Sequence, residues 1–154
     1  MTASNPTGQA RSTGSAYITL LLDTLGNQEP MPIHETTPAR IARAIAGLDA
    51  VTLSRPEQPG KWSIVGVIQH LADSELVYGY RIRMIASHPT PDIQAFDQDL
   101  WARELDYEHR DAAQALEDFR AQREANVRCC GPSTPRNWGA GVTTASAGGR
   151  VSPT

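Results

Sequence analysis

One long helix that opens with a sharp start signal constrains this chain more than any other feature. Pro59 and Gly60 interrupt the preceding segment, and Ser63 has the side chain of a helix N-cap. Apolar residues then recur at alternating spacings of three and four, the period of an α-helix that buries one face. This stripe, which Glu75 interrupts, consists of Ile64, Ile68, Leu71, Tyr78, Ile82 and Ile85. The pattern predicts a helix over residues 63–87 in a helical bundle.

The remaining sequence also carries helical periodicity, and no segment shows the sustained alternation of a strand. We expect Thr37 to cap a helix that has Pro38 at its first position, where the missing N–H costs nothing. Asp97 and Asp111 have the side chains of further N-caps. The other predicted helices are therefore 17–25, 37–48, 98–105 and 111–128. These elements predict an all-α fold.

His70 is the first candidate for a functional residue. At about 100° per residue it lies beside the apolar stripe, on the flank that it shares with Val67, Ser74 and Val77. An imidazole there faces the seam between two helices, where bundles build metal and ligand sites. Asp73 lies one turn further on, so His70 and Asp73 could contact one ion or one water. The simpler interpretation, a half-buried histidine with one hydrogen bond, stays open beside that of a metal ligand.

Acidic residues at two other places need an explanation. Glu75 interrupts the apolar stripe, so we expect either an arginine such as Arg40 or Arg43 to neutralise it, or a polar cavity around it. Asp97 and Asp99 are spaced like part of a calcium loop, but the glycine and terminal glutamate of an EF-hand are missing. The sequence contains no Ser-His-Asp order, phosphate-binding glycine loop or H-E-x-x-H motif.

Several short motifs, in one order along most of the chain, resemble the DinB-like family of metalloenzymes. They are TPARI at 37–41, WS at 62–63, HLADSE at 70–75 and AFDQDLW at 95–101. The resemblance implies a four-helix bundle that binds a divalent metal, such as zinc or nickel, through three histidines, one of which matches His70. It also implies a thiol-dependent transferase or a hydrolase that acts on a small-molecule thiol or electrophile, with the metal lowering the pKa of the bound nucleophile.

The other two metal ligands of that family, an H-x-x-x-H pair on the last helix, have no counterpart in this chain. The remaining histidines are His34, His88 and His109, and none has another histidine four residues later. We therefore expect a bundle that is incomplete at its C-terminus, little or no bound metal, and no activity of the intact family. The alternative is a non-catalytic helical module that binds a partner or a ligand.

Composition divides the chain into three expected regions: a disordered N-terminus (1–15), a helical domain (16–128) and a tail (129–154). Gly, Ala, Ser, Thr and Pro dominate the tail, which predicts disorder and resembles a coding sequence read out of frame. A bundle that lacks one helix exposes an apolar groove, so we expect either an aggregation-prone chain or a homodimer that buries the groove.

Charge and cysteine content limit the partners and the cellular compartment that we expect for this chain. A formal net charge of −3 with scattered basic residues excludes a nucleic-acid partner, which needs a basic face. The longest apolar run is far shorter than the roughly 20 residues that cross a membrane, so no membrane partner is expected. The chain has two cysteines, Cys129 and Cys130, which are adjacent and form no disulfide framework. This predicts a reducing, cytoplasmic location.

Overall fold

The computed structural model of the chain describes residues 14–130 and 143–144. Within them, extended structure amounts to a parallel pair of two-residue strands. The predicted all-α class is therefore confirmed. The elements in chain order are α2 (Gly14–Leu25), α3 (Pro30–Ile45), α4 (Ala50–Ser54), α5 (Ile64–Ser87), β1 (Asp92–Ile93), α6 (Gln98–Glu104), the 3-10 helix η2 (Tyr107–His109), α7 (Ala112–Cys129) and β2 (Thr143–Thr144).

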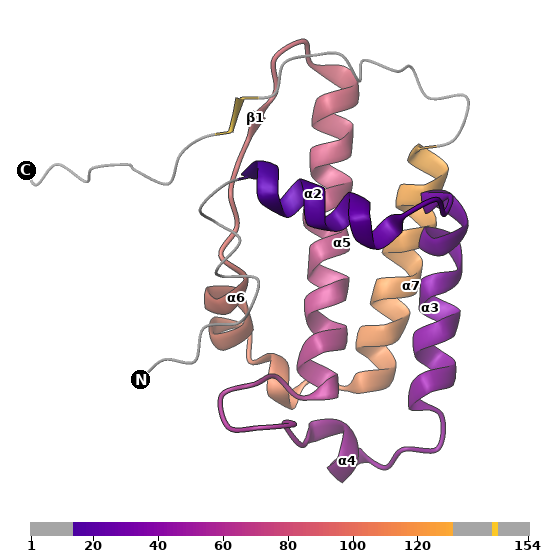
Figure 1. The fold of residues 1–154 in the computed structure, drawn as a ribbon. Helices are drawn as coiled ribbons and strands as arrows, with labels where there is room; N and C mark the ends of the chain where they lie inside the picture. Colours follow the sequence, from indigo (N-terminus) through magenta and orange to yellow (C-terminus); the bar gives the residue numbers. More distant parts are fainter. Residues whose placement is uncertain (1–13, 131–142, 145–154) are drawn as a thin grey trace, which may run out of the picture.

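Three long helices, α3, α5 and α7, stand side by side and form the bundle (Figure 1). Both α5 and α3 pack against α7. The connector after α5 returns along the bundle through β1, α6 and η2, so α5 and α7 run in the same direction (Figure 1). Helix α2 lies across α5, towards the end of the bundle opposite α4 (Figure 1). Helix α7 stands between α5 and α3 in this view, and these two helices pack mainly on α7 and not on each other (Figure 1).

The predicted N-caps of three helices are confirmed by their hydrogen bonds. The Ser63 hydroxyl accepts from the backbone N–H of Gly66 at 3.1 Å and so opens α5. Asp97 accepts from two backbone N–H groups at the start of α6. Asp111 accepts from the N–H of Gln114 at 2.7 Å at the start of α7. Each of these caps bonds to a residue two or three positions away, so the local sequence suffices to set it.

The predicted start of the second helix is wrong, because α3 begins at Pro30 and Pro38 lies inside it. The Thr37 hydroxyl donates back to the carbonyl of Ile33 at 2.6 Å, as a threonine in a helix interior does. Proline inside a helix leaves the carbonyl four residues earlier without its N–H donor, here that of His34. Arg123 of α7 donates to this carbonyl at 2.8 Å. A contact from a distant part of the chain therefore stabilises a helix that the sequence pattern would end.

The core lies between α5 and α7, on a face of α5 that is rotated from the predicted stripe. Of that stripe Ile68 is buried, whereas Tyr78 is 49% exposed, so the prediction of Tyr78 as a core residue is wrong. Small residues on α5 explain the difference, since they allow α7 to approach closely and to insert larger side chains. The buried apolar residues of the two helices are Val65, Ile68, Ala72, Ala115 and Phe119.

Glu75 is buried in this core and is neutralised by an arginine, but not by Arg40 or Arg43, which are both exposed. Its partner is Arg123 of α7, which donates to the Glu75 carboxylate at 2.7 Å in a buried ion pair. The side-chain amide of Asn126 donates to the same carboxylate at 3.0 Å and to the Glu75 carbonyl at 2.8 Å. A polar network therefore crosses the main helix–helix contact.

No helix among residues 14–130 is long and apolar enough to cross a bilayer. The expected disorder of the N-terminus concerns residues that lie mostly outside those described, although α2 already begins at Gly14. Most of the predicted tail also lies outside them. Within it, α7 ends at Cys129, and β2 pairs with β1 through Asp92–Thr143 and Ile93–Thr144.

Candidate functional site

Aromatic side chains from outside α5 surround His70 on that helix. The ring of Trp62, just before α5, lies 4.9 Å from the imidazole, centroid to centroid. Phe96, in the loop before α6, stacks on the imidazole at 6.5 Å and contacts Trp101 of α6 at 5.1 Å. His70 therefore faces the seam between α5 and the connector that carries α6, and not the contact between α5 and another long helix. The surroundings are apolar and exclude water from one side of the ring.

The two polar neighbours that the sequence places beside His70 have different roles. Ser74 lies within 3.4 Å of Nε2 of the imidazole, whereas Nδ1 is buried and has no hydrogen-bond partner. The Asp73 carboxylate instead accepts from the Tyr107 hydroxyl at 2.5 Å and from Gln69 at 3.3 Å. Asp73 therefore holds the connector against α5, and Ser74 is the hydrogen-bonding neighbour of the ring.

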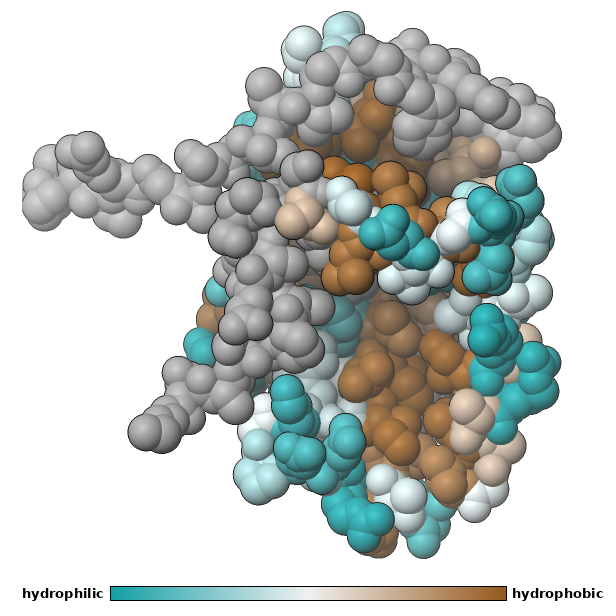
Figure 2. All heavy atoms as spheres, in the orientation of Figure 1, coloured by the Kyte–Doolittle hydropathy of each residue, from teal (hydrophilic) through white to brown (hydrophobic). Residues whose placement is uncertain are grey.

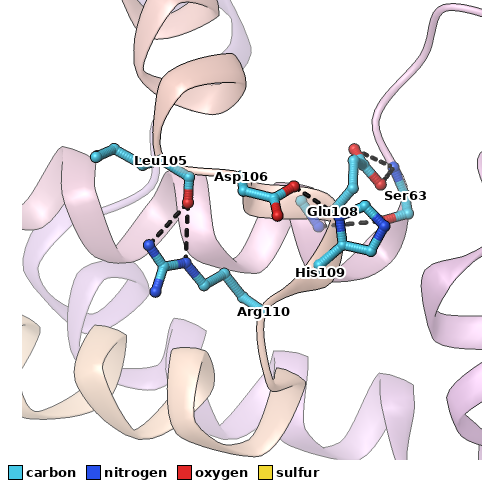
Figure 3. Close-up of polar contacts among 7 residues, drawn as sticks. Ser63, Leu105, Asp106, Glu108, His109 and Arg110 are labelled. Carbon is cyan, nitrogen blue, oxygen red and sulfur yellow. Dashed lines mark hydrogen bonds and ion pairs between the residues drawn. The ribbon is translucent and has the colours of Figure 1, made fainter.

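The corner around η2 is fixed to the N-terminus of α5, as Figure 3 shows. The Glu108 carboxylate accepts from the backbone N–H of Ser63 at 3.2 and 3.3 Å, and so adds a second cap to α5. Within the corner, Asp106 pairs with His109 at 2.6 Å, and Arg110 donates to the Leu105 carbonyl at 2.8 and 3.0 Å (Figure 3). These bonds position η2 so that the fully buried Tyr107 reaches Asp73.

Burial controls the protonation of His70. The loss of water around the ring lowers the pKa of His70 from its usual 6.5, although the negative charges of Asp73 and Asp99 oppose the shift. The imidazole is therefore neutral at physiological pH and keeps a nitrogen lone pair. A neutral imidazole is the form that binds a metal or accepts a proton.

These residues fit one position of a metal site and not a complete one. Among residues 14–130 and 143–144, no group of three or more His, Cys, Asp or Glu side chains could hold a metal ion. Cys129 and Cys130 form no disulfide and are half-buried, and burial raises the pKa of the Cys130 thiol, which disfavours the thiolate that a metal requires. A three-ligand site around His70 would thus need donors that the described residues do not bring to it.

An apolar groove of about 670 Å³ lies between α3 and α5, beside Trp62. Figure 2 shows apolar side chains, drawn in brown, gathered on this face of the molecule below α2. The groove ends at polar residues around α4, among them Arg55 and Glu57. The aliphatic side chains that line it, besides Pro56, are Ile41, Ile45, Ile64, Val67, Ile68 and Leu71. Much of the stripe that the sequence predicts as core therefore lines this groove.

Sequence reasoning singled out His70, but it did not place the aromatic side chains beside His70 or identify the residue that binds Asp73. Trp62, Phe96 and Trp101 all lie in the short motifs that carry the family resemblance. Tyr107 follows those motifs, and no periodicity or spacing marked it. Its role depends on a hydrogen bond between residues 34 positions apart, and a pattern within a single helix cannot reveal such a bond.

The fold and the His70 helix define a DinB-type helical bundle, and comparison with known proteins agrees. The sequence profile of the DinB superfamily matches residues 33–153. The chain belongs to the DinB superfamily. The predicted resemblance is thereby confirmed.

Related proteins share both fold and sequence over part of their length. A structure titled "YfiT from Bacillus subtilis is a probable metal-dependent hydrolase with an unusual four-helix bundle topology" superposes with a TM-score of 0.67 at 22% identity, covering 74% of this chain and 65% of that one. The same protein, named "Putative metal-dependent hydrolase YfiT", is 28% identical over 84 residues, and an Oceanobacillus iheyensis protein, "Putative metal-dependent hydrolase OB0413", is 32% identical over 72 residues. These sequence matches cover 54% and 47% of this chain, and 47% and 42% of those relatives. The chain thus spans less than half of the length of the curated relatives that it matches.

Proposed function

We propose that this chain is a DinB-superfamily scaffold of the divalent-metal-dependent transferase or hydrolase type, in which His70 is the one metal-ligand position retained. The observation that carries this proposal is the neutral imidazole of His70, whose buried Nδ1 has no partner. The names of the relatives, which describe metal-dependent hydrolases, support the same class. When bound, a divalent metal would supply a Lewis acid and an activated nucleophile.

The chain's own residues would prepare a ligand position and hold it in place. Trp62 and Phe96 exclude water from His70, which keeps the imidazole neutral. Asp73 and Tyr107 hold the connector against α5 and so fix the position of Phe96, the aromatic side chain that the connector places beside His70. Because two of the three histidines of the family are missing from the chain, we expect weak metal binding and no turnover of a thiol or an electrophile. The decrease in metal affinity should exceed the roughly 10–100-fold decrease that follows removal of a residue that only supports a metal ligand.

Metal titration tests the proposal. We expect Ni²⁺ to bind weakly to the purified chain and to quench Trp62 fluorescence, since the indole lies 4.9 Å from His70. His70→Ala should abolish this response. His109→Ala, which removes an exposed histidine, is the matched control and should leave the response unchanged. Tightly bound metal that survives both substitutions and chelation would contradict the proposal.

The α3–α5 groove favours a second candidate, a non-catalytic helical interaction module. The groove presents an apolar lining to solvent, and Val67 in it is 43% exposed. Soluble monomers rarely keep large contiguous apolar patches, so such a face often marks a binding surface. The absence of a disulfide at Cys129 and Cys130 and the scattered charge suit a cytoplasmic protein partner and not a nucleic acid.

A further inference from the structure

The structure contains two apolar surfaces that are open to solvent, one on helix α2 and one in the groove between α3 and α5. Helix α2 carries apolar residues at positions i, i+3, i+4 and i+7, which is the anchor spacing of a helix that lies in a groove. These anchors are Ile18, Leu21, Leu22 and Leu25, of which the first three are 57%, 50% and 61% exposed. The groove between α3 and α5 is likewise open to solvent and lined by aliphatic side chains.

We propose that α2 of a second copy of this chain docks in the α3–α5 groove, and that the two copies exchange these contacts in a symmetric dimer. This inference deepens the second candidate function and does not depend on His70 or on a metal. A twofold axis makes every contact twice, since each copy offers one helix and one groove.

The α2 helix of the same chain cannot fill the groove. The connector between α2 and α3 forms a tight turn, in which Gly26 has a φ of 58° and the N–H of Gln28 donates to the carbonyl of Leu25. At about 1.5 Å per residue, the groove residues Ile41 and Ile45 lie about 16 and 22 Å along α3 from its start. The anchors of α2 extend only about 10 Å back from Leu25. Folded back along its own α3, α2 would stop short of the groove, whereas the α2 of another copy has no such limit.

The area that such a dimer buries is sufficient for a stable contact. A helix of 12 residues is about 18 Å long and about 10 Å wide, so covering half of it buries roughly 280 Å². The groove buries a similar area, and the twofold axis doubles the sum to roughly 1,100 Å². This total exceeds the roughly 1,000 Å² expected of a specific interface and lies near the lower end of the usual range. We therefore expect a dimer that dissociates on dilution.

A second groove, of about 700 Å³ between α3 and α7, is the less suitable docking surface. Its rim carries Arg120, which forms ion pairs with both Glu117 and Glu124. Covering these charges with an apolar helix would remove them from water without new partners. The α3–α5 groove has an aliphatic lining and meets charged residues chiefly at its α4 end.

Sedimentation of the full chain and of single variants tests the proposal. We expect a monomer–dimer equilibrium for the unchanged protein. Leu22→Asp on α2 and Val67→Asp in the groove should each weaken dimerisation about tenfold or more, because each buries an unpaired carboxylate in an apolar contact. Leu76→Asp is the matched control, since Leu76 is 57% exposed on α5 and lies outside the groove lining. A monomer at all concentrations, or a dimer that survives both substitutions, would overturn the proposal.

Disulfide trapping separates exchange between copies from docking within one chain. The variant carries Leu22→Cys and Val67→Cys, with Cys129→Ala and Cys130→Ala to remove the native thiols. We expect oxidation to give covalent dimers on a non-reducing gel, while circular dichroism verifies the helical fold. A crosslink confined to monomers would show that α2 folds onto its own groove and would overturn the proposal. An absence of crosslinks in a protein that sediments as a dimer would assign the interface elsewhere and would overturn it equally.

Discussion

Arg123 donates a 2.8 Å hydrogen bond to the backbone carbonyl of His34, the carbonyl that Pro38 leaves without its helical donor. The same guanidinium forms the buried ion pair with Glu75 at 2.7 Å and lies over the ring of Phe119 at 4.8 Å. One side chain on α7 therefore connects α3 to α5 across the core. The stability of the bundle should depend on it.

We expect Arg123→Met to destabilise the protein by about 3–5 kcal/mol, because it leaves the Glu75 carboxylate buried without its charged partner. Arg120→Met makes the same change on the same helix, but at a surface ion pair that contributes at most about 1 kcal/mol. Urea denaturation of the two variants measures the difference. Adding Glu75→Leu to Arg123→Met should restore much of the lost stability, since no buried charge remains. Equal effects of the two arginine substitutions would contradict this role of Arg123.

Two glycines of α5 should respond differently to alanine. A Cβ on Gly79 would overlap the Asn126 amide, a short buried side chain that bonds Glu75 and Arg83. A Cβ on Gly66 would lie 2.6 Å from the end of the longer Glu108 side chain, which can move. Alanine favours a helix over glycine by about 1 kcal/mol, so Gly66→Ala should be near neutral. Gly79→Ala should cost about 1–3 kcal/mol through the broken network. Thermal unfolding of the two variants compares their stabilities directly. A stabilised Gly79→Ala would contradict this prediction, because it would show that the hydrogen bonds of Asn126 tolerate the added methyl group.

The hydrogen bond between Tyr107 and Asp73 should stabilise the packing of the connector against α5. Tyr107→Phe keeps the buried ring and removes the hydroxyl that lies 2.5 Å from the carboxylate. We expect a loss of about 1.5–3 kcal/mol, typical of a hydrogen bond to a charged group. Tyr80→Phe, at a residue that is 56% exposed, should change the free energy of unfolding by less than about 0.5 kcal/mol. Indistinguishable unfolding curves for the two variants would mean that Asp73 exchanges this partner for water.

Stability should fall as the pH drops below about 6.5, the usual pKa of histidine. Burial lowers the pKa of both His34 and His70, so the unfolded chain binds protons in a pH range where the folded chain does not. The stability that these residues contribute is therefore complete above pH 6.5 and is lost as the pH falls towards their folded pKa values. His34→Gln and His70→Gln should flatten this dependence in denaturation curves recorded at several pH values with a chelator present.

The pKa of His109 shifts in the opposite direction, so this residue serves as a control. Its hydrogen bond to Asp106 raises its pKa, so its contribution is present at low pH and disappears as the pH rises through the folded pKa. His109→Gln should therefore steepen the loss of stability in acid. A loss that is equally steep in all three variants would assign the acid sensitivity to carboxylates.

Local features of the fold were open to prediction because they rest on short-range bonds. Ser63, Asp97 and Asp111 each cap a helix through an N–H two or three residues away, and the structure confirms all three. The predicted helix start at Thr37 was wrong because the cost of Pro38 inside α3 is offset by Arg123, which lies 89 positions from the carbonyl it bonds. A local rule cannot include a partner at that distance.

The sequence by itself determined the helical class, the family, the helix that carries His70 and the absence of an H-x-x-x-H pair in this chain. All of these depend on spacings within one segment or on the order of short motifs. Tertiary structure alone decided that Glu75 pairs with Arg123 from 48 positions away, that Tyr107 binds Asp73, and which face of α5 is buried. The physical reason is that a buried charge or hydroxyl must find a partner in the three-dimensional packing. Residues with suitable chemistry occur at many positions, and the approach of α7 to the small residues of α5 selects among them.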